Sequence, residues 1–188
     1  DVPGNNYSMP VTEAAHKHYE MMNLVTPPEM DTVRAWRLYF NEPDKNQLPY
    51  IAKVSKLIAE KHVADGTRAV FMGLNAGEPE PAQWDDPAVI DFLRYVTQHP
   101  QQLAISLHEY SFSTNIQSEY PWLVGRFQKL QEACVRNGID WSRLTIIVGE
   151  FGHGRDQGTF PGVNQAMNDI GWAAQLYGAH NNIRLVAF

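Results

Sequence analysis

Residues 36–43 have the sequence WRLYFNEP, in which a short apolar run ends directly on an asparagine, a glutamate and a proline. Four further runs of the same kind follow along the chain, each rich in apolar, β-branched or aromatic side chains. They are residues 69–72, 103–107, 144–148 and 184–188. Several of the runs are almost continuously apolar instead of alternating, and this pattern indicates strands of a parallel sheet that is buried on both faces.

Amphipathic stretches with the helical period lie between these runs and before the first of them. They are residues 12–22, 51–58, 89–96, 123–134 and 163–177. Asp86 and Pro87 suit the first turn of a helix, whereas Gly66 and Gly138 are typical of a helix end. The strict alternation of strand and helix predicts right-handed crossovers and an all-parallel sheet.

The spacing of the predicted strand ends is even. Markers near these ends are separated by 33, 33, 42 and 38 residues, and they are Glu42, Asn75, His108, Glu150 and Phe188. This pace fits a (β/α)8 TIM barrel, although a doubly wound sheet has a similar rhythm. No glycine-rich nucleotide-binding motif follows any of the runs, which weakens the doubly wound alternative. We therefore expect an α/β fold of the barrel type.

The composition excludes several classes of protein. The 188 residues carry 15 basic and 21 acidic side chains, a net charge of −6, and 44% of them are hydrophobic. The basic residues are scattered, which argues against a nucleic acid or an anionic membrane surface as partner. No run is long enough for a transmembrane helix, and the single Cys134 rules out an internal disulfide. Both a secreted and a cytoplasmic location fit this composition.

Two glutamates, Glu42 and Glu150, stand directly after apolar runs. Because the carboxyl ends of parallel strands converge on one mouth, we expect these two side chains to face each other. Paired carboxylates across a sugar-sized gap are what cleavage of a glycosidic bond needs: one protonates the leaving oxygen and the other attacks the anomeric carbon. Like charges so close oppose each other's ionisation, so that one proton stays on the pair.

Three segments then make the interpretation more specific. Asn41-Glu42-Pro43 resembles the strand-4 signature of clan A glycoside hydrolases, a group of retaining (β/α)8 enzymes that includes cellulases, mannanases and β-galactosidases. Residues 146–152, IIVGEFG, look like the strand-7 nucleophile segment, and residues 107–110, LHEY, look like the end of strand 6. The resemblance implies a retaining hydrolase of β-linked oligo- or polysaccharides that requires no metal ion and no organic cofactor.

The resemblance also implies roles for individual residues. Glu42 would be the acid/base and Glu150 the nucleophile. Asn41 would bind the 2-hydroxyl of the sugar, and Tyr110 or His108 would orient the nucleophile or touch the sugar.

Further candidates for substrate binding come from the residues at the expected mouth, namely Asn75, Trp84 and His153. Trp84 can stack on a pyranose ring or cover the rim of the barrel. Glu109 ranks below Glu150 as a catalytic candidate, because adjacent residues on a strand point to opposite faces.

The resemblance begins near Trp36, which only 35 residues precede, and the last run ends at Phe188. A complete barrel typically needs about 250 residues. We therefore expect residues 1–188 to form one catalytic domain that corresponds to strands 4–8, without strands 1–3 and the last helix. The missing part of the same barrel is then an expected partner.

Two alternatives from other functional classes remain. The first is a carbohydrate-binding barrel without turnover, because the Arg and the Trp that clan A enzymes usually contribute from strands 2 and 8 cannot be assigned here. The second is a metal-dependent barrel hydrolase that uses His108 and His153 as ligands, although no Asp or third His accompanies them at a strand end. Our preferred interpretation assigns no residue to a metal.

Overall fold

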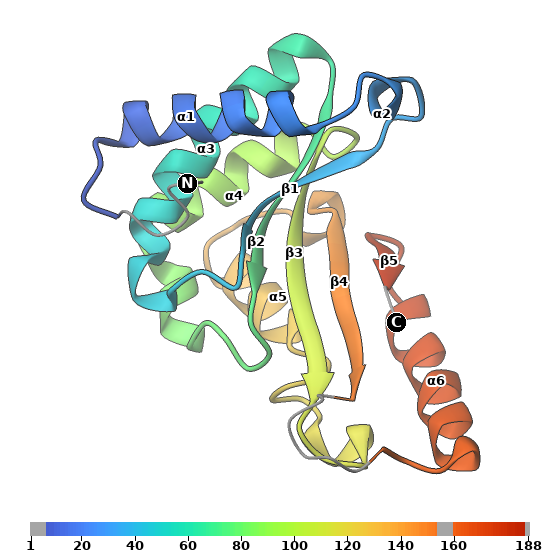
Figure 1. Ribbon diagram of the computed structural model, residues 1–188. Helices are drawn as coiled ribbons and strands as arrows, with labels where there is room; N and C mark the ends of the chain where they lie inside the picture. Colours follow the sequence, from blue (N-terminus) through green and yellow to red (C-terminus); the bar gives the residue numbers. More distant parts are fainter. Residues whose placement is uncertain (1–6, 154–159, 187–188) are drawn as a thin grey trace.

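Five parallel strands form the centre of the computed structural model, which describes residues 7–153 and 160–186 (Figure 1). The strands are β1 (Trp36–Asn41), β2 (Arg68–Leu74), β3 (Leu103–Ser111), β4 (Ile146–His153) and β5 (Ile183–Val186). Each predicted apolar run overlaps one of them, although β4 begins two residues after the start of the run 144–148, and residues 187–188 of the last run lie outside the described residues. The order of the strands in the sheet is their order in the chain, and all neighbouring pairs are parallel. The predicted all-parallel α/β sheet is therefore confirmed.

Helices alternate with the strands as predicted. They are α1 (Val11–Val25), the short α2 (Glu29–Thr32), α3 (Leu48–Asp65), α4 (Pro87–Gln98), α5 (Phe127–Arg136) and α6 (Val163–Gly178). Gly66 ends α3 in the left-handed conformation, with φ of 69°, and the Asp86 carboxylate caps α4 by accepting the Ala88 N–H at 2.8 Å. None of the helices in the described residues has both the length and the apolar character that crossing a bilayer would take.

Helix α5 starts later than the sequence predicts, at Phe127 instead of residue 123. The physical reason is a buried carboxylate that determines where the first turn lies. Glu109 of β3 accepts the backbone N–H groups of Gly125 and Phe127 at 2.6 and 2.8 Å, respectively. Gly125 has a φ of 77°, a conformation that residues with a side chain seldom adopt, and the chain turns into the helix there.

The two faces of the sheet are covered differently. One face contributes strand side chains such as Tyr39, Phe71 and Ile105 to the main core, where residues of α1, α3, α4, α5 and α6 join them. The other face carries a second, smaller apolar cluster. Its members come from the strands, and they are Val70, Ala104 and Ile147 with Trp36 and Leu38 packed against them. Within the part of the chain that the structure describes, no helical residue belongs to this second cluster.

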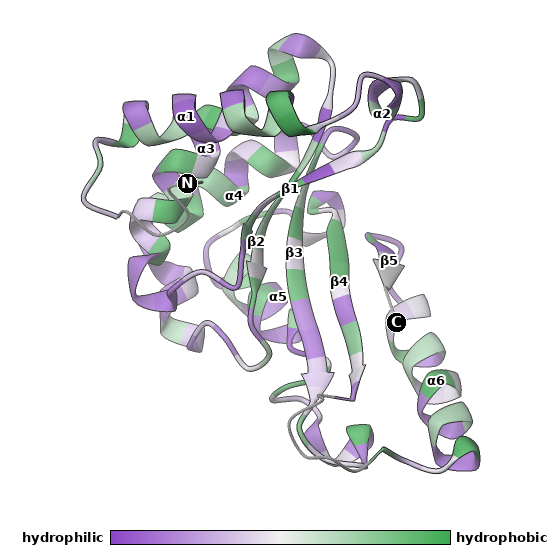
Figure 2. Cartoon of the chain, in the orientation of Figure 1, coloured by the Kyte–Doolittle hydropathy of each residue, from purple (hydrophilic) through white to green (hydrophobic). Residues whose placement is uncertain are grey.

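The polarity of the strands changes along their length. Figure 2 shows β3 green over its first half, then purple, and pale at its arrowhead. The polar residues His108 and Glu109 belong to the second half of this strand. Because the strands are parallel, their polar ends lie at the same edge of the sheet. The candidate residues that the sequence predicts at the strand ends belong to this edge of the sheet.

Candidate active site

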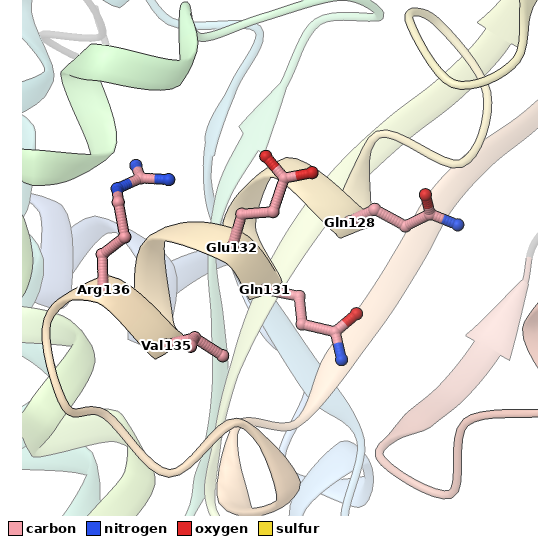
Figure 3. A pocket seen from close by; sticks show the side chains of 5 residues that line it. All are labelled: Gln128, Gln131, Glu132, Val135 and Arg136. Carbon is pink, nitrogen blue, oxygen red and sulfur yellow. The ribbon is translucent and has the colours of Figure 1, made fainter.

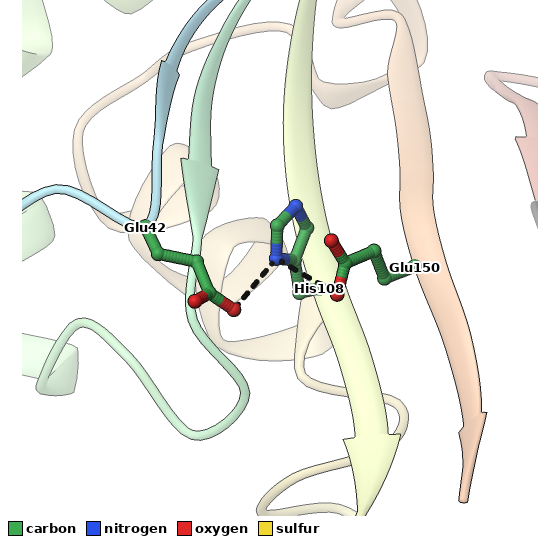
Figure 4. Close-up of side chains that lie close together, drawn as sticks. All are labelled: Glu42, His108 and Glu150. Carbon is green, nitrogen blue, oxygen red and sulfur yellow. Dashed lines mark hydrogen bonds and ion pairs between the residues drawn. The ribbon is translucent and has the colours of Figure 1, made fainter. Parts of the chain in front are cut away.

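Glu42, His108 and Glu150 gather at the carboxyl ends of three strands (Figure 4). Glu42 directly follows β1, His108 belongs to β3 and Glu150 belongs to β4. One carboxylate oxygen or ring nitrogen from each residue lies within 4.8 Å of those of the other two. The structure therefore brings together the two glutamates that the sequence placed at one mouth, although β2 lies between β1 and β3.

A buried imidazole bridges the two carboxylates. His108 is 2% exposed, and its Nδ1 lies 3.2 Å from Oε1 of Glu42 and 3.6 Å from Oε2 of Glu150. The side chains of the two glutamates remain 37% and 51% exposed, respectively. Nδ1 can donate a hydrogen bond to either carboxylate when that carboxylate is ionised. His108 is thus a buried side chain in contact with two carboxylates that are open to solvent.

Two glycines, one on each strand beside β3, make room for side chains of β3: Gly73 for His108 and Gly149 for Ser106. A Cβ atom at Gly73 of β2 would lie 3.1 Å from Nε2 of His108. A Cβ atom at Gly149 of β4 would lie 2.7 Å from Oγ of Ser106 and 3.6 Å from the His108 ring. Sequence reasoning missed both positions, although a glycine inside an apolar strand is a known sign of close approach by a neighbouring group.

The backbone around the end of β1 has an unusual conformation. Phe40 and Glu42 have φ angles of 64° and 45°, and Met72 on the adjacent strand has 60°. Such angles in residues other than glycine cost on the order of 1–3 kcal/mol each and occur mainly where the surroundings hold them in place. The Glu42 N–H donates to the carbonyl oxygen of Gly73 at 2.7 Å. This bond holds the backbone of Glu42 against β2, and its side chain reaches His108 on β3.

Tyr110 contacts Glu42 in the same site. Its hydroxyl donates to Oε1 of Glu42 at 2.9 Å, and it is also hydrogen-bonded to Oδ1 of Asn75. Burial, and after it the hydrogen bond to the Glu42 carboxylate, raises the pKa of Tyr110, so the phenol stays a neutral donor. The resemblance implied that Tyr110 or His108 orients Glu150. In the structure His108 lies against both carboxylates, and Tyr110 contacts Glu42.

The remaining candidates differ in where they lie. Asn41 ends β1, and its Oδ1 would lie 3.5 Å from a Cβ at Gly73, which places it at the same end of the sheet. Trp84 is 1% exposed and packs in the main core, so neither face of its ring is open to a sugar. Of the two roles considered for Trp84, the structure favours packing.

His153 has other partners than the carboxylate site. Its Nδ1 donates to the carbonyl oxygen of Ser113 at 3.1 Å, and its Nε2 lies 3.5 Å from the buried carboxylate of Asp169. The only group of three or more potential metal ligands in residues 7–153 and 160–186 consists of Glu42, His108 and Glu150. A metal ion would therefore take one imidazole and two carboxylates there, and His153 is not among these ligands.

A separate hollow lies on the outer side of α5 (Figure 3). Its lining belongs to that one helix and consists of Gln128, Gln131, Glu132, Val135 and Arg136. Figure 3 shows long polar side chains extending from the helix with no cluster of convergent groups among them. We therefore assign no chemistry to this surface.

Glu109 lies on the opposite face of β3 from His108, as the alternation of side chains along a strand requires. It is completely buried and accepts the Tyr177 hydroxyl at 2.6 Å, in addition to the two N–H groups of the α5 turn. Burial raises the pKa of Glu109 to about 7, and the donors from Tyr177, Phe127 and Gly125 oppose this rise. Glu109 thus joins β3, α5 and α6 inside the core and has no access to a substrate.

The raised pKa of Glu109 predicts a specific dependence of stability on pH. The folded protein holds this proton more tightly than the unfolded chain, so the stabilisation is complete below pH 4.5, the ordinary value, and is lost as the pH rises through about 7. Relative to Glu109→Gln, which cannot ionise, we expect the wild type to lose about 2–3 kcal/mol of unfolding free energy between pH 5 and pH 8. Urea unfolding at both pH values measures this difference.

Glu132→Gln, at an exposed position of α5, is the control and should leave the unfolding free energy unchanged at both pH values. Parallel pH profiles for Glu109→Gln and the wild type would contradict the prediction.

Comparison of the chain with protein-family models, with curated proteins and with solved structures gives no match. The structure itself shows the class of protein. It is an α/β domain with an all-parallel five-stranded sheet and a cluster of two carboxylates and one imidazole toward the carboxyl ends of its strands.

Proposed function

We propose that this chain forms strands 4–8 of a (β/α)8 barrel that hydrolyses β-glycosidic bonds in oligo- or polysaccharides with retention of configuration. Two features of the fold support the barrel. The strand order follows the chain without reversal in the described sheet, whereas a doubly wound sheet reverses its order at a switch point. Among the described residues, helical side chains join the core on one face of the sheet, as they would on the outside of a barrel, and the second apolar cluster would then face the barrel interior. The missing strands of the barrel would be the partner of this sheet.

The separation of the two carboxylates carries the proposed activity. Oxygens of Glu42 and Glu150 lie within 4.8 Å of each other. In retaining glycosidases the two carboxyl groups stand about 5–5.5 Å apart, whereas inverting enzymes need about 6.5–9.5 Å to admit a water molecule between carboxylate and sugar. The upper bound of 4.8 Å between these oxygens is shorter than the separation that an inverting enzyme needs, and it supports the retaining mechanism over the inverting one.

The proposed reaction proceeds in two displacements. Glu150 attacks the anomeric carbon while the bond to the leaving oxygen breaks, and Glu42 gives its proton to that oxygen. A water molecule then attacks the glycosyl ester, Glu42 takes the proton from the water, and Glu150 leaves as a carboxylate. The assignment of the two roles follows the clan A resemblance. The donors from Tyr110 and His108 suit the second step, in which Glu42 must be an anion that is oriented toward water.

Asn41 and Asn75 are the proposed sugar-binding groups beside the carboxylates. Both side chains lie at the same end of the sheet as Glu42, Asn41 next to Gly73 and Asn75 against Tyr110. Their amides can both donate to and accept from sugar hydroxyls.

A second candidate is a metal-dependent hydrolase, and the observation that favours it is the compact Glu42–His108–Glu150 group. One imidazole and two carboxylates would suit Zn²⁺ or Mn²⁺, with open positions for a water molecule and a substrate. In this alternative the glutamates hold the ion and do not react with the sugar themselves. The two candidates make opposite predictions for chelation.

The stereochemistry of the first product tests the proposal. When a β-linked oligosaccharide is hydrolysed in an NMR tube, we expect the β-anomer of the new reducing end to appear first and to mutarotate later. The rate should not change with EDTA. If the α-anomer appears first, the mechanism is inverting and the proposal is wrong. Loss of activity in EDTA that is restored by zinc or manganese would support the metal-dependent candidate, and binding without release of reducing sugar would indicate a carbohydrate-binding barrel.

A further inference from the structure

Three aromatic side chains follow one another along the same face of β3 and its continuation. His108, Tyr110 and Phe112 are two residues apart, and in an extended chain such residues share a face. The His108 and Tyr110 rings have centroids 6.4 Å apart, and the Tyr110 and Phe112 rings are 5.5 Å apart in an edge-to-face arrangement at 88°. Exposure rises along this series, from 2% at His108 through half-buried Tyr110 to 39% at Phe112. The series, which we call the β3 aromatic row, therefore leads from the buried His108 to solvent.

The loop that carries Phe112 is held by its own hydrogen bonds. The Ser113 N–H donates to Oγ of Ser111 at 3.0 Å, and the Ser113 hydroxyl donates to the carbonyl oxygen of Asn115 at 2.9 Å. His153 of β4 donates to the Ser113 carbonyl at 3.1 Å. Gln117, further along the same loop, donates to the buried Asp169 of α6 at 3.1 Å. Phe112 thus exposes an apolar ring on a segment that two other elements keep in place.

Tyr110 connects the β3 aromatic row to one of the two carboxylates, that of Glu42. The hydroxyl of Tyr110 reaches Glu42 and Asn75, on the β1 and β2 side of the sheet, and Phe112 packs against the ring of Tyr110. Glu42 is the proposed proton donor to the leaving oxygen. The part of a substrate that follows this oxygen therefore lies on the side of Glu42.

We propose that Phe112 is the platform for the sugar ring on the leaving-group side of the cleaved bond, an inference that rests on the proposed glycosidase function. One face of a pyranose presents C–H groups and is apolar, so it can cover an exposed aromatic ring and remove both surfaces from water. The substrate class is accordingly an oligo- or polysaccharide whose leaving group is itself a sugar. A glycoside with a small leaving group gains nothing from Phe112.

Kinetics with two kinds of leaving group test this subsite. The probes are the β-1,4-linked trisaccharides of glucose, mannose and galactose, together with the matching β-glycosyl fluorides, whose fluoride ion is too small to reach Phe112. We expect Phe112→Ala to lower kcat/KM about tenfold for the trisaccharide that the protein hydrolyses best and to leave the value for the fluoride within about twofold. Phe112→Tyr, which keeps the ring, should behave as the wild type toward both probes.

Trp122→Ala is the matched control, because Trp122 is another exposed aromatic residue, at 59%, and contacts Lys129 instead of the β3 aromatic row. It should leave the ratio of the two kcat/KM values unchanged. An equal loss for trisaccharide and fluoride in Phe112→Ala, no loss for either, or the same selective loss in Trp122→Ala would overturn the proposed subsite.

Titration calorimetry separates failure of this inference from failure of the proposed function. If the wild type hydrolyses neither probe, the glycosidase proposal fails, and trisaccharide binding is then compared between wild type and Phe112→Ala. Binding that weakens about tenfold in the variant would retain Phe112 as a sugar platform of a binding protein. Equal binding, or no binding to the wild type, would overturn the platform as well.

Discussion

Replacing Glu150 by alanine is expected to lower kcat/KM by about 10⁴-fold or more for every β-linked substrate, because the proposed mechanism assigns the covalent bond to the anomeric carbon to Glu150. Glu150 is half exposed in the second half of β4, and its Oε2 contacts Nδ1 of His108 at 3.6 Å. Its truncation therefore leaves the core intact, and the variant should unfold at the same urea concentration as the wild type. Loss of activity together with loss of folding would not support the assigned role.

Small anions should restore part of the activity of Glu150→Ala. The truncation leaves space beneath the sugar, and azide in that space can attack the anomeric carbon while an activated leaving group such as fluoride departs. Because this attack replaces only the first displacement, the product is the α-glycosyl azide, which NMR identifies. Formation of the β-glycosyl azide instead would show that Glu150 is the acid/base and that the two roles must be exchanged. Glu132→Ala, at an exposed position of α5, is the carboxylate control and should retain full activity.

Replacing Glu42 by glutamine should reduce kcat/KM for oligosaccharides by about 10²–10⁴-fold, the usual contribution of a general acid, and should reduce it far less for glycosyl fluorides. An oligosaccharide leaves as a sugar alkoxide that needs a proton, whereas fluoride leaves without one. The glutamine side chain retains the shape of the glutamate and can still accept from the Tyr110 hydroxyl, so the rest of the site should keep its geometry.

The second displacement offers an independent measurement on the same residue. Without Glu42 as base, hydrolysis of the glycosyl ester is slow, so a covalent adduct on Glu150 should accumulate and be detected by mass spectrometry. Azide should accelerate turnover of Glu42→Ala and give the β-glycosyl azide, the opposite anomer from the Glu150 variant. If Glu42→Gln slows oligosaccharides and fluorides equally, Glu42 is not the proton donor.

Several features of the fold were predictable because they depend on residues near one another in the chain. The five apolar runs, the capping carboxylate of Asp86 and the left-handed Gly66 all act over a few positions, and they form the predicted strands and helix ends. The start of α5 was not predictable in this way. It depends on Glu109, which is 18 residues before Phe127 in sequence and becomes its hydrogen-bond partner only when β3 and α5 pack together.

The candidate site likewise has features that depend on local sequence and features that depend on tertiary contacts. The residue types Glu42, His108 and Glu150 at the ends of apolar runs were sufficient to choose the candidates, because parallel strands bring their carboxyl ends to one edge. The packing of Trp84 and the partners of His153 were not visible in the sequence. Both depend on contacts with segments that are distant in the sequence, and local patterns do not record such contacts. Phe112 was not among the predicted candidates, because it follows the end of β3 and lies outside the apolar run 103–107.

The amino-acid sequence alone established the alternating strands and helices, the parallel sheet and the two glutamates worth examining, since hydrophobic period and strand-end position are local properties of the chain. The distance of 4.8 Å or less between carboxylates 108 residues apart and the imidazole that contacts both of them depend on tertiary packing. These contacts form where Gly73 leaves space beside His108 and the backbone around the end of β1 adopts positive φ angles. Such steric relations exist only between segments that the folded chain has placed side by side.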